Sequence, residues 1–547
     1  MAEYINNLIQ LQKWVNLFAG YILWLMMVYL TDVWELELIH AAAIINIWMG
    51  LSKVLPIVFA HLADSFLGNF FVVLFSSFSS MIGLGLIWMS TPPVLGKSNG
   101  NCTQYKPECI GEQQKQLLYA GLAFTAVGIA AHTASYAPYS REHLEVIDDS
   151  CDCECVCCCV GCRTHLVALA ALLVAAFVKP WATLFGICAI LGVVSFLACL
   201  ILRVTKGCND NNPVLRPQGS PLTTIFRVFF AASSKSFCRR PHDANELYEK
   251  PDPNQELLPH SKSLSGLDKA AVIKAEPALE QQEQKRWSLC KVTEVEETKI
   301  FIRTIPIWMT FIVCGVVSSL GATYFLEQAK CLDPRVGKAK APLILFLWFY
   351  DQFRRSFTTS FLGTFALSGR YAPRIGIVVA MMYATLSCIA AAKVETRRLG
   401  VVKNHDLIDK PDERVPMTIF WLLPQFVLLG GLDGIQRLCA YSFSVDQAPS
   451  SMIKYFNLFA RGFFGLGVMG SVVSVYIVGM ISEAKTGTNW FQNTLNTSRL
   501  DNYYWVLATL AAVNLVVYIL VACLFRYRES RLEQMVQGAF NFMDDDF

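Results

Sequence analysis

Charged residues are scarce in this chain. Asp, Glu, Lys and Arg make up 16% of the 547 residues, whereas a soluble domain carries about 25%. Hydrophobic residues reach 54%, and the mean hydropathy is +0.41. So few charges could not cover the surface of a soluble protein of this size. The composition therefore excludes a cytosolic enzyme, a nucleic-acid-binding protein and a disordered scaffold, and the net charge of +3 indicates no polyanionic partner.

Motifs for chemistry are also lacking. The sequence contains no Gly-rich phosphate-binding loop, no nucleophile–base arrangement and no catalytic pair of carboxylates. These absences disfavour an ATP-driven pump and a membrane enzyme, and no cofactor is expected. The N-terminus is polar and carries no small-residue cleavage site, so no cleavable signal peptide is expected.

Long apolar segments dominate what is present. A helix that spans a bilayer needs roughly 20 mostly apolar residues, because lipid offers its backbone no hydrogen bonds. Two of the candidate windows are weak: His165 interrupts the fifth, and Asp351, Arg354 and Arg355 interrupt the eighth. The sequence predicts an all-α polytopic membrane protein with twelve transmembrane helices, near 14–30, 40–60, 70–90, 117–137, 163–180, 183–202, 302–325, 343–366, 375–392, 417–440, 455–482 and 503–525.

One polar segment divides these spans into six plus six. It covers 203–300 and holds 15 basic and 13 acidic residues, with one amphipathic helix expected near 266–286. We therefore predict an N-terminal six-helix bundle (1–202), the linker, a C-terminal six-helix bundle (301–526) and a tail (527–547). Two helical halves joined by a polar linker resemble the layout of major-facilitator transporters.

Basic residues predict which side of the membrane each loop faces. Seven Lys or Arg against one Asp in 203–240 place the linker, and hence both termini, in the cytosol. The acidic loop 31–39 agrees with an outward position, whereas the basic loop 393–416 does not. Asn101 and Asn496, the two sequons, fall in outward loops and are predicted glycosylation sites. The host membrane, plasma membrane or endomembrane, stays undecided.

Short motifs identify a family. In order along the chain they are Asn46–Gly50, Ala63–Gly68, Gly219–Thr223, Val292–Glu297, Pro306–Trp308, Phe420–Gln425, Asp446–Pro449 and Leu500–Trp505. Together they resemble the plant nitrate/peptide transporter family, a branch of the proton-coupled oligopeptide transporters within the major facilitator superfamily. The resemblance implies alternating access of a central cavity, and substrates such as nitrate, small peptides, hormones or specialised metabolites.

The chain departs from this family where protons are usually handled. Family members carry a Glu-x-x-Glu-Arg run in the first span, but residues 13–19 here contain no acid and no Arg. The Arg that usually follows the Ala63–Gly68 motif is Asn69, and the polar Tyr and Gln of the seventh span are Ser318 and Leu320. We therefore expect proton coupling to be atypical or absent.

Ionisable residues inside the spans are the candidate site, because a charge in lipid is costly unless it is paired. Asp433 falls where the family usually has a Glu implicated in binding substrate or a proton. Asp433 is either a substrate-facing carboxylate or the partner of Arg437 or Arg461 in a structural ion pair. Lys53 either faces a cavity or snorkels to the membrane edge. We predict Asp433, Arg437 and Lys53 as substrate-binding residues for an anionic or zwitterionic solute, and Asp64 and Arg461 as conformational residues.

Helical spacing makes two further predictions. Asp351, Arg354 and Arg355 should face water or the cavity rather than lipid. Glycines in the eleventh span indicate close helix packing or a hinge, at Gly462, Gly465, Gly467 and Gly470.

A cysteine cluster is the most unusual segment. Seven of the 19 cysteines lie within 151–162, interleaved with acidic residues. The cluster could be S-acylated at the membrane edge, could bind a soft metal through Cys151, Cys153, Cys155 and Cys157, or could have no function. The alternatives to a solute transporter are thus an exporter or uniporter of a metal chelate regulated by the cluster, and a non-transporting sensor. The expected partners are a small solute and membrane lipid, with no nucleic acid.

Overall fold

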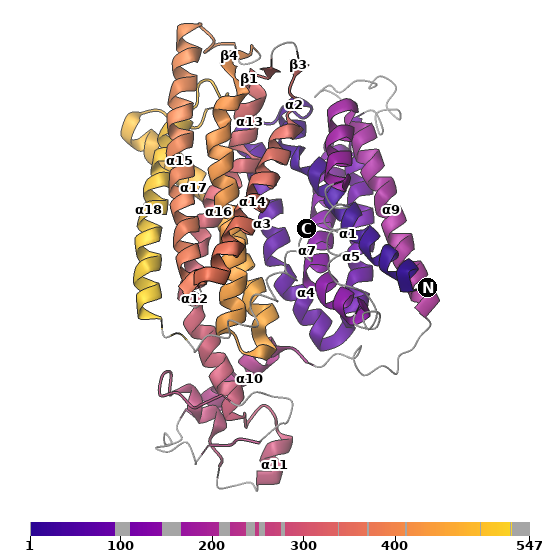
Figure 1. Ribbon diagram of the computed structural model, residues 1–547, viewed down its shortest axis with the longest axis vertical. Helices are drawn as coiled ribbons and strands as arrows, with labels where there is room; N and C mark the ends of the chain where they lie inside the picture. The colour runs from indigo at the N-terminus through magenta and orange to yellow at the C-terminus, as the bar shows by residue number, and fades with distance from the viewer. Residues whose placement is uncertain are drawn as a thin grey trace.

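The computed structural model describes residues 2–92, 110–144, 166–206, 219–236, 247–250, 258–274, 279–336, 339–368, 371–410, 413–492, 494–525 and 527. The Cys151–Cys162 cluster and Asn101 lie outside this part of the chain. The described chain is dominated by long helices that run side by side along the long axis of the molecule (Figure 1).

The first half forms one helical bundle. Its helices are α1 (Ala2–Trp24), α2 (Met26–Asp32), α3 (Leu38–Val54), α4 (Pro56–Leu62), the π-helical turn η1 (Ala63–Leu67), α5 (Asn69–Met89), α7 (Glu112–Leu144), a short helix Leu166–Phe177 and α9 (Trp181–Lys206). Helix α5 packs against α7 and α9, and α1 packs against α9. Glycines permit the close α5–α7 contact, since a Cβ on Gly121 would lie 2.9 Å from the carbonyl oxygen of Gly83.

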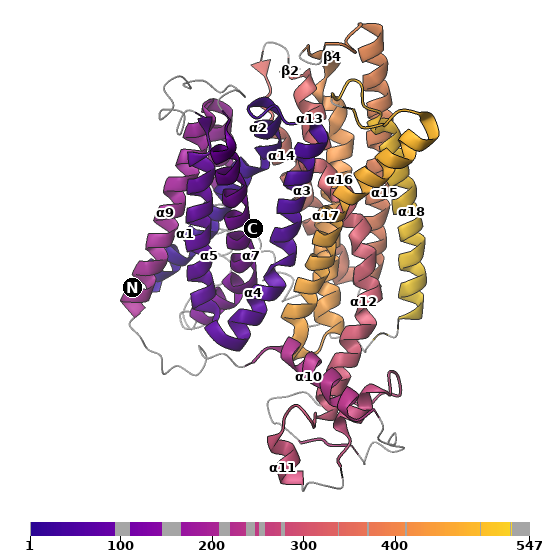
Figure 2. The same cartoon turned by 180° about the vertical axis from the view of Figure 1, so that it is seen from behind.

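The second half forms the other bundle. Its elements are α12 (Val292–Ser318), η7 (Ser319–Ala322), α13 (Tyr324–Cys331), α14 (Ile344–Ser368), α15 (Ala372–Asn404), η9 (Ile419–Leu422), α16 (Leu423–Gln447), η10 (Ser450–Met452), α17 (Ile453–Thr486) and α18 (Leu500–Leu524). Helix α15 packs against α16 and α18, and α12 packs against α17. The two bundles stand beside each other and meet where α3 packs against α17 (Figures 1 and 2).

Short strands and turns cap one end of the molecule. Strand β1 (Leu332–Asp333) pairs in parallel with β4 (Val415–Thr418), and β2 (Arg335–Val336) pairs antiparallel with β3 (Ala339–Lys340). Helices α2 and α13 lie at this end, whereas the linker elements lie at the opposite end (Figure 1). The loops predicted to face opposite sides of the membrane are therefore separated by the length of the bundles.

Ten helical stretches among the described residues are long and apolar enough to cross a membrane. They match ten of the twelve predicted spans. The other two are the windows that the sequence marks as weak: the fifth is the shorter apolar helix Leu166–Phe177, and the eighth is α14, which carries Asp351, Arg354 and Arg355. The predicted twelve-helix architecture is consistent with the structure.

The linker folds differently from the prediction. The prediction of a single amphipathic helix near 266–286 is wrong. The described part of this region contains the 3-10 turn η6 (Leu267–Ala271) and the short helix α11 (Leu279–Gln284). The amphipathic helix is α10 (Pro221–Ser234), whose apolar residues Val228 and Ala231 pack against Ala270, Ala271 and Val295 in a small separate core. The apolar residues of η6 are therefore buried in this small core although they lie in a 3-10 turn and not in an α-helix.

Helix α12 begins inside the predicted linker. The carboxylate of Glu294 accepts a hydrogen bond from the backbone N–H of Lys291 (3.1 Å), which caps the helix at Val292. The first turns of α12 thus belong to the polar segment, and the boundary predicted at residue 300 falls within a continuous helix.

Candidate functional site

A cavity of about 220 Å³ lies between the two bundles. The N-terminal bundle contributes Trp24 from α1 and Met49 and Lys53 from α3. The C-terminal bundle contributes the end of α12 and one face each of α14, α16 and α17. The structure brings four predicted residues to this one cavity: Lys53, Asp433, Arg437 and Arg461.

Asp433 is held by two hydroxyl groups. Its Oδ2 accepts a hydrogen bond from Ser318 Oγ (3.0 Å) and another from the hydroxyl of Tyr350. Its Oδ1 is buried and has no hydrogen-bond partner among the described residues. The structural ion pair with Arg437 or Arg461 is not formed within the described chain. The geometry therefore favours the other interpretation, a carboxylate with one oxygen that can receive a donor from a solute.

Helix α14 connects the cavity to the opposite bundle. Asp351 pairs with Arg354 (2.6 Å) and Arg355 (2.9 Å) on its own helix, and it accepts a hydrogen bond from Tyr21 on α1 (2.9 Å). Of the three charged residues predicted to face water or the cavity, Arg354 is the one in the described cavity lining. Asp351 thus touches both a cavity cation and a residue of the other bundle.

Close packing of the α3 and α17 backbones fixes the position of the Lys53 Cβ atom. A Cβ on Gly465 of α17 would lie 2.7 Å from Lys53 Cβ and 3.0 Å from the carbonyl oxygen of Gly50. A Cβ on Gly462 would lie 2.8 Å from Ile57, and Gly467 sits directly against α12, whereas Gly470 has open space around it. Three of the four glycines in the predicted group are therefore required for close packing.

Asp64 joins the bundles at the linker end. Its carboxylate accepts hydrogen bonds from Lys454 Nζ (2.9 Å) and the Tyr455 hydroxyl (2.7 Å), both at the start of α17. The linker also takes part, because Ser220 hydrogen-bonds to Tyr455 (2.8 Å) and the N–H of Gly219 donates to the carbonyl oxygen of Asp64 (3.0 Å). Arg461, predicted together with Asp64, instead lines the cavity two turns further along α17.

A second set of contacts joins the bundles at the other end. Lys330 on α13 forms an ion pair with Asp32 on α2 and another with Glu327 (3.0 Å), and Thr31 donates a hydrogen bond to Glu327 (3.1 Å). The cavity therefore lies between two groups of polar contacts that bridge the bundles.

Comparisons with known proteins agree with this architecture. Residues 70–350 match the family model described as PTR2: POT family. The protein NRT1/PTR FAMILY 5.5 of Arabidopsis thaliana is 35% identical over 530 residues, which cover 94% of this chain and 95% of that protein. The chain belongs to the POT family. It is accordingly an integral multi-pass membrane protein and a membrane transporter of this family.

Solved POT-family structures share the fold. An auto-inhibited POT family peptide transporter superposes with a TM-score of 0.61 at 15% identity, covering 96% of this chain and 99% of that one. A POT family transporter in complex with 5-aminolevulinic acid superposes with a TM-score of 0.59 at 11% identity, covering 94% and 95%. At these identities the likeness concerns the fold alone.

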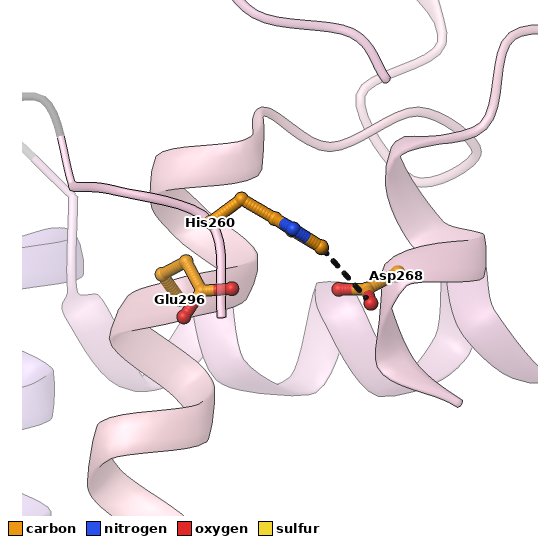
Figure 3. Close-up of side chains that lie close together, drawn as sticks. All are labelled: His260, Asp268 and Glu296. Carbon is orange, nitrogen blue, oxygen red and sulfur yellow. Dashed lines mark ion pairs between the residues drawn. The ribbon is translucent and has the colours of Figure 1, made fainter. Parts of the chain in front are cut away.

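The linker of this POT transporter contains a separate polar cluster (Figure 3). His260, Asp268 and Glu296 bring one possible ligand atom each within 4.8 Å of one another. However, Lys299 Nζ lies 2.6 Å from Asp268 and 2.6 Å from Glu296. The ammonium already supplies the positive charge between the carboxylates, so the cluster fits an ion-pair network better than a metal site.

Asn496 does not fit a glycosylation site. The residue is 7% exposed, its Nδ2 donates to the carbonyl oxygen of Leu407 (3.0 Å), and its Oδ1 accepts from Arg398 (2.8 Å). A glycan on Nδ2 would break this buried packing. Asn101 and the proposed metal ligands Cys151, Cys153, Cys155 and Cys157 lie outside the described residues. Metal binding and S-acylation there draw no support from the comparisons.

Cys290 is a cysteine of the linker whose thiol is buried. The side chain is fully buried in the small core beside Glu294. Burial, together with the negative charge of Glu294, raises the pKa of Cys290 to about 11. This cysteine is therefore a neutral core residue at physiological pH.

The sequence does not predict several residues that line the cavity. Trp24 and Tyr350 are aromatic residues in spans and resemble ordinary core residues. Ser318 stands out in the sequence only as a departure from the family. One signal was available: Tyr350 lies four residues before Arg354, so both share a helix face.

Proposed function

We propose that this POT-family transporter carries a small anionic or zwitterionic solute across the membrane by alternating access. The observation that supports the proposal is the central cavity, whose described lining contains Lys53, Arg354, Arg437 and Arg461 together with one carboxylate, that of Asp433. Cations in a site of low dielectric constant favour an anionic group. Asp433 Oδ1 could in addition accept a hydrogen bond from an ammonium group of a zwitterion.

The arrangement of the contacts supports alternating access. The bundles are bridged at one end by Asp64 with Lys454 and Tyr455, and at the other end by Lys330 with Asp32. Rocking of one bundle against the other would break one set while the other set is kept. The solute would then reach the cavity from one side at a time.

Proton coupling in this proposal is atypical or absent. None of residues 13–19, where the family's acids would stand, lines the cavity. The neighbouring Gln12 is buried and donates a hydrogen bond to Ser77 (2.6 Å) within the N-terminal bundle. Any coupling must therefore use other groups. The described residues give no support to the alternatives of a metal-chelate exporter or a non-transporting sensor.

A flux assay tests the proposal. The full-length protein in oocytes or proteoliposomes is offered labelled nitrate, dipeptides, amino acids and organic acids, each at an acidic and at a neutral outside pH. We expect uptake or efflux of at least one anionic or zwitterionic solute and none of sugars, with Asp433→Asn altering the preference. No flux across the whole panel, with surface expression confirmed, would contradict the proposal.

A further inference from the structure

Lys53 differs from the other cations of the cavity. Among the residues that the structure describes, it forms no hydrogen bond or ion pair, although the charges of Asp433, Arg461, Arg437 and Arg354 act on it. It is also the cation that the N-terminal bundle contributes to the described cavity lining. Its stem is clamped where α3 meets α17, because Gly50 and Gly465 bring the two backbones together there. The side-chain nitrogen of Lys53 is therefore held between the bundles.

The charges that face Lys53 come from three helices of the other bundle. Asp433 and Arg437 lie on α16, Arg461 lies on α17, and Arg354 lies on α14. The carboxylate of Asp433 already accepts hydrogen bonds from Ser318 and Tyr350 through Oδ2. A guanidinium group stays charged in any protein environment, whereas a lysine amine can gain or lose its proton. Among these cations, Lys53 is thus the one whose charge can follow the occupancy of the cavity.

We propose that Lys53 binds the proton that accompanies the anionic group of the solute. This proposal rests on the proposed function and adds the route of its atypical coupling. When an anion enters, the Lys53 amine takes one proton from water and the resulting ammonium pairs with the anion. When the anion leaves on the other side, the proton is released there. One anion and one proton cross together, and no net charge moves.

Strong-acid anions provide a clean probe because they carry no proton of their own. Nitrate or methanesulfonate is added to the purified full-length protein in weakly buffered solution with a pH indicator, and anion binding is measured in parallel by thermal shift. We expect uptake of about one proton per bound anion, falling to none when the anion is removed.

Three variants assign the proton. Lys53→Arg keeps a permanent charge, so it should bind the anion with no proton uptake. Lys53→Met should bind the anion about tenfold more weakly or worse, since a charge-assisted contact is lost. Asp433→Asn should keep the proton uptake. If Asp433→Asn abolishes the uptake while Lys53→Arg retains it, the proton belongs to Asp433 and the proposal is wrong.

Failure of this proposal can be told from failure of the proposed function. Anion binding by the wild type without proton uptake overturns only the role of Lys53. The absence of both binding and flux for every anion, in protein that unfolds cooperatively and is monodisperse, overturns the anion-carrying function and the role of Lys53 together.

Discussion

The hydroxyl group of Tyr21 crosses from α1 to Asp351 on α14, and Asp351 in turn holds Arg354 at the cavity wall. Tyr21 itself does not appear in the cavity lining. This single hydrogen bond therefore links the position of the N-terminal bundle to the position of a cavity cation without contacting the solute. A hydrogen bond to a charged acceptor contributes about 1.5–3 kcal/mol.

Tyr21→Phe removes this hydroxyl and little else. We expect the maximal transport rate to change several-fold while the apparent affinity for solute stays nearly constant, because the bundle contact is lost and the cavity lining is kept. The measurement is the concentration dependence of flux in proteoliposomes. Tyr503→Phe is the matched control: it removes a hydroxyl bonded to Ser474 (2.7 Å) inside one bundle. A changed affinity with an unchanged rate in Tyr21→Phe would contradict the assignment.

At the residue scale, the sequence identified charges better than it identified neutral partners. Lys53, Asp433, Arg437 and Arg461 could be named because an ionisable group in lipid needs a reason to be there. Tyr350 and Ser318, which hold Asp433, could not be named as its partners, because a hydroxyl in a span is common. The Lys330–Asp32 ion pair was also missed, since it joins residues about 300 positions apart and depends on how the bundles dock.

At the element scale, α17 is the helix on which the bundles depend. It packs on α3 of one bundle and on α12 of the other, and glycines allow both approaches. The glycine pattern predicted close packing or a hinge. The sequence could not tell which glycine is in contact, because that depends on the rotation of the helix. In the linker, Ser220 and Pro221 mark the start of α10 as N-cap and first helical residue. This signal could have located α10.

Gly465→Ala tests the α3–α17 contact. The added methyl group would meet Lys53 Cβ and the carbonyl oxygen of Gly50, so we expect a loss of about 1–3 kcal/mol in stability and a several-fold loss of transport. Gly470→Ala is the control on the same helix, since a Cβ there meets nothing within 4 Å. The control should keep its activity and unfold at the same or a slightly higher temperature. Equal behaviour of the two variants in thermal unfolding and flux would disprove the role assigned to Gly465.

At the scale of the whole molecule, the two bundles are held together at both ends around the cavity. The contacts of Asp64 with Lys454 and Tyr455 hold the linker end, and those of Lys330 with Asp32 and Glu327 hold the other. The twelve-helix layout could be predicted from hydropathy, and its division into halves from the charged segment 203–300. The pairing of helices across the halves could not, because every span offers a similar apolar surface.

Removing the bundle contacts at one end should loosen the structure at that end only. In Asp64→Asn, we expect faster amide hydrogen exchange in η1 and in the first turns of α17, with no change in α13. In Lys330→Met, exchange should rise in α2 and α13 and stay unchanged near Asp64. Hydrogen exchange with mass spectrometry of the purified variants measures both effects. Exchange that rises at both ends in either variant would indicate general loosening and not separate gates.

Ser220 and Gly219 bind Tyr455 and Asp64 at the point where the linker enters α10. The linker that joins the halves covalently therefore also joins them by hydrogen bonds. These bonds can form only while the two bundles are in contact at that end. We therefore expect a change in how the linker is docked to alter the transport cycle.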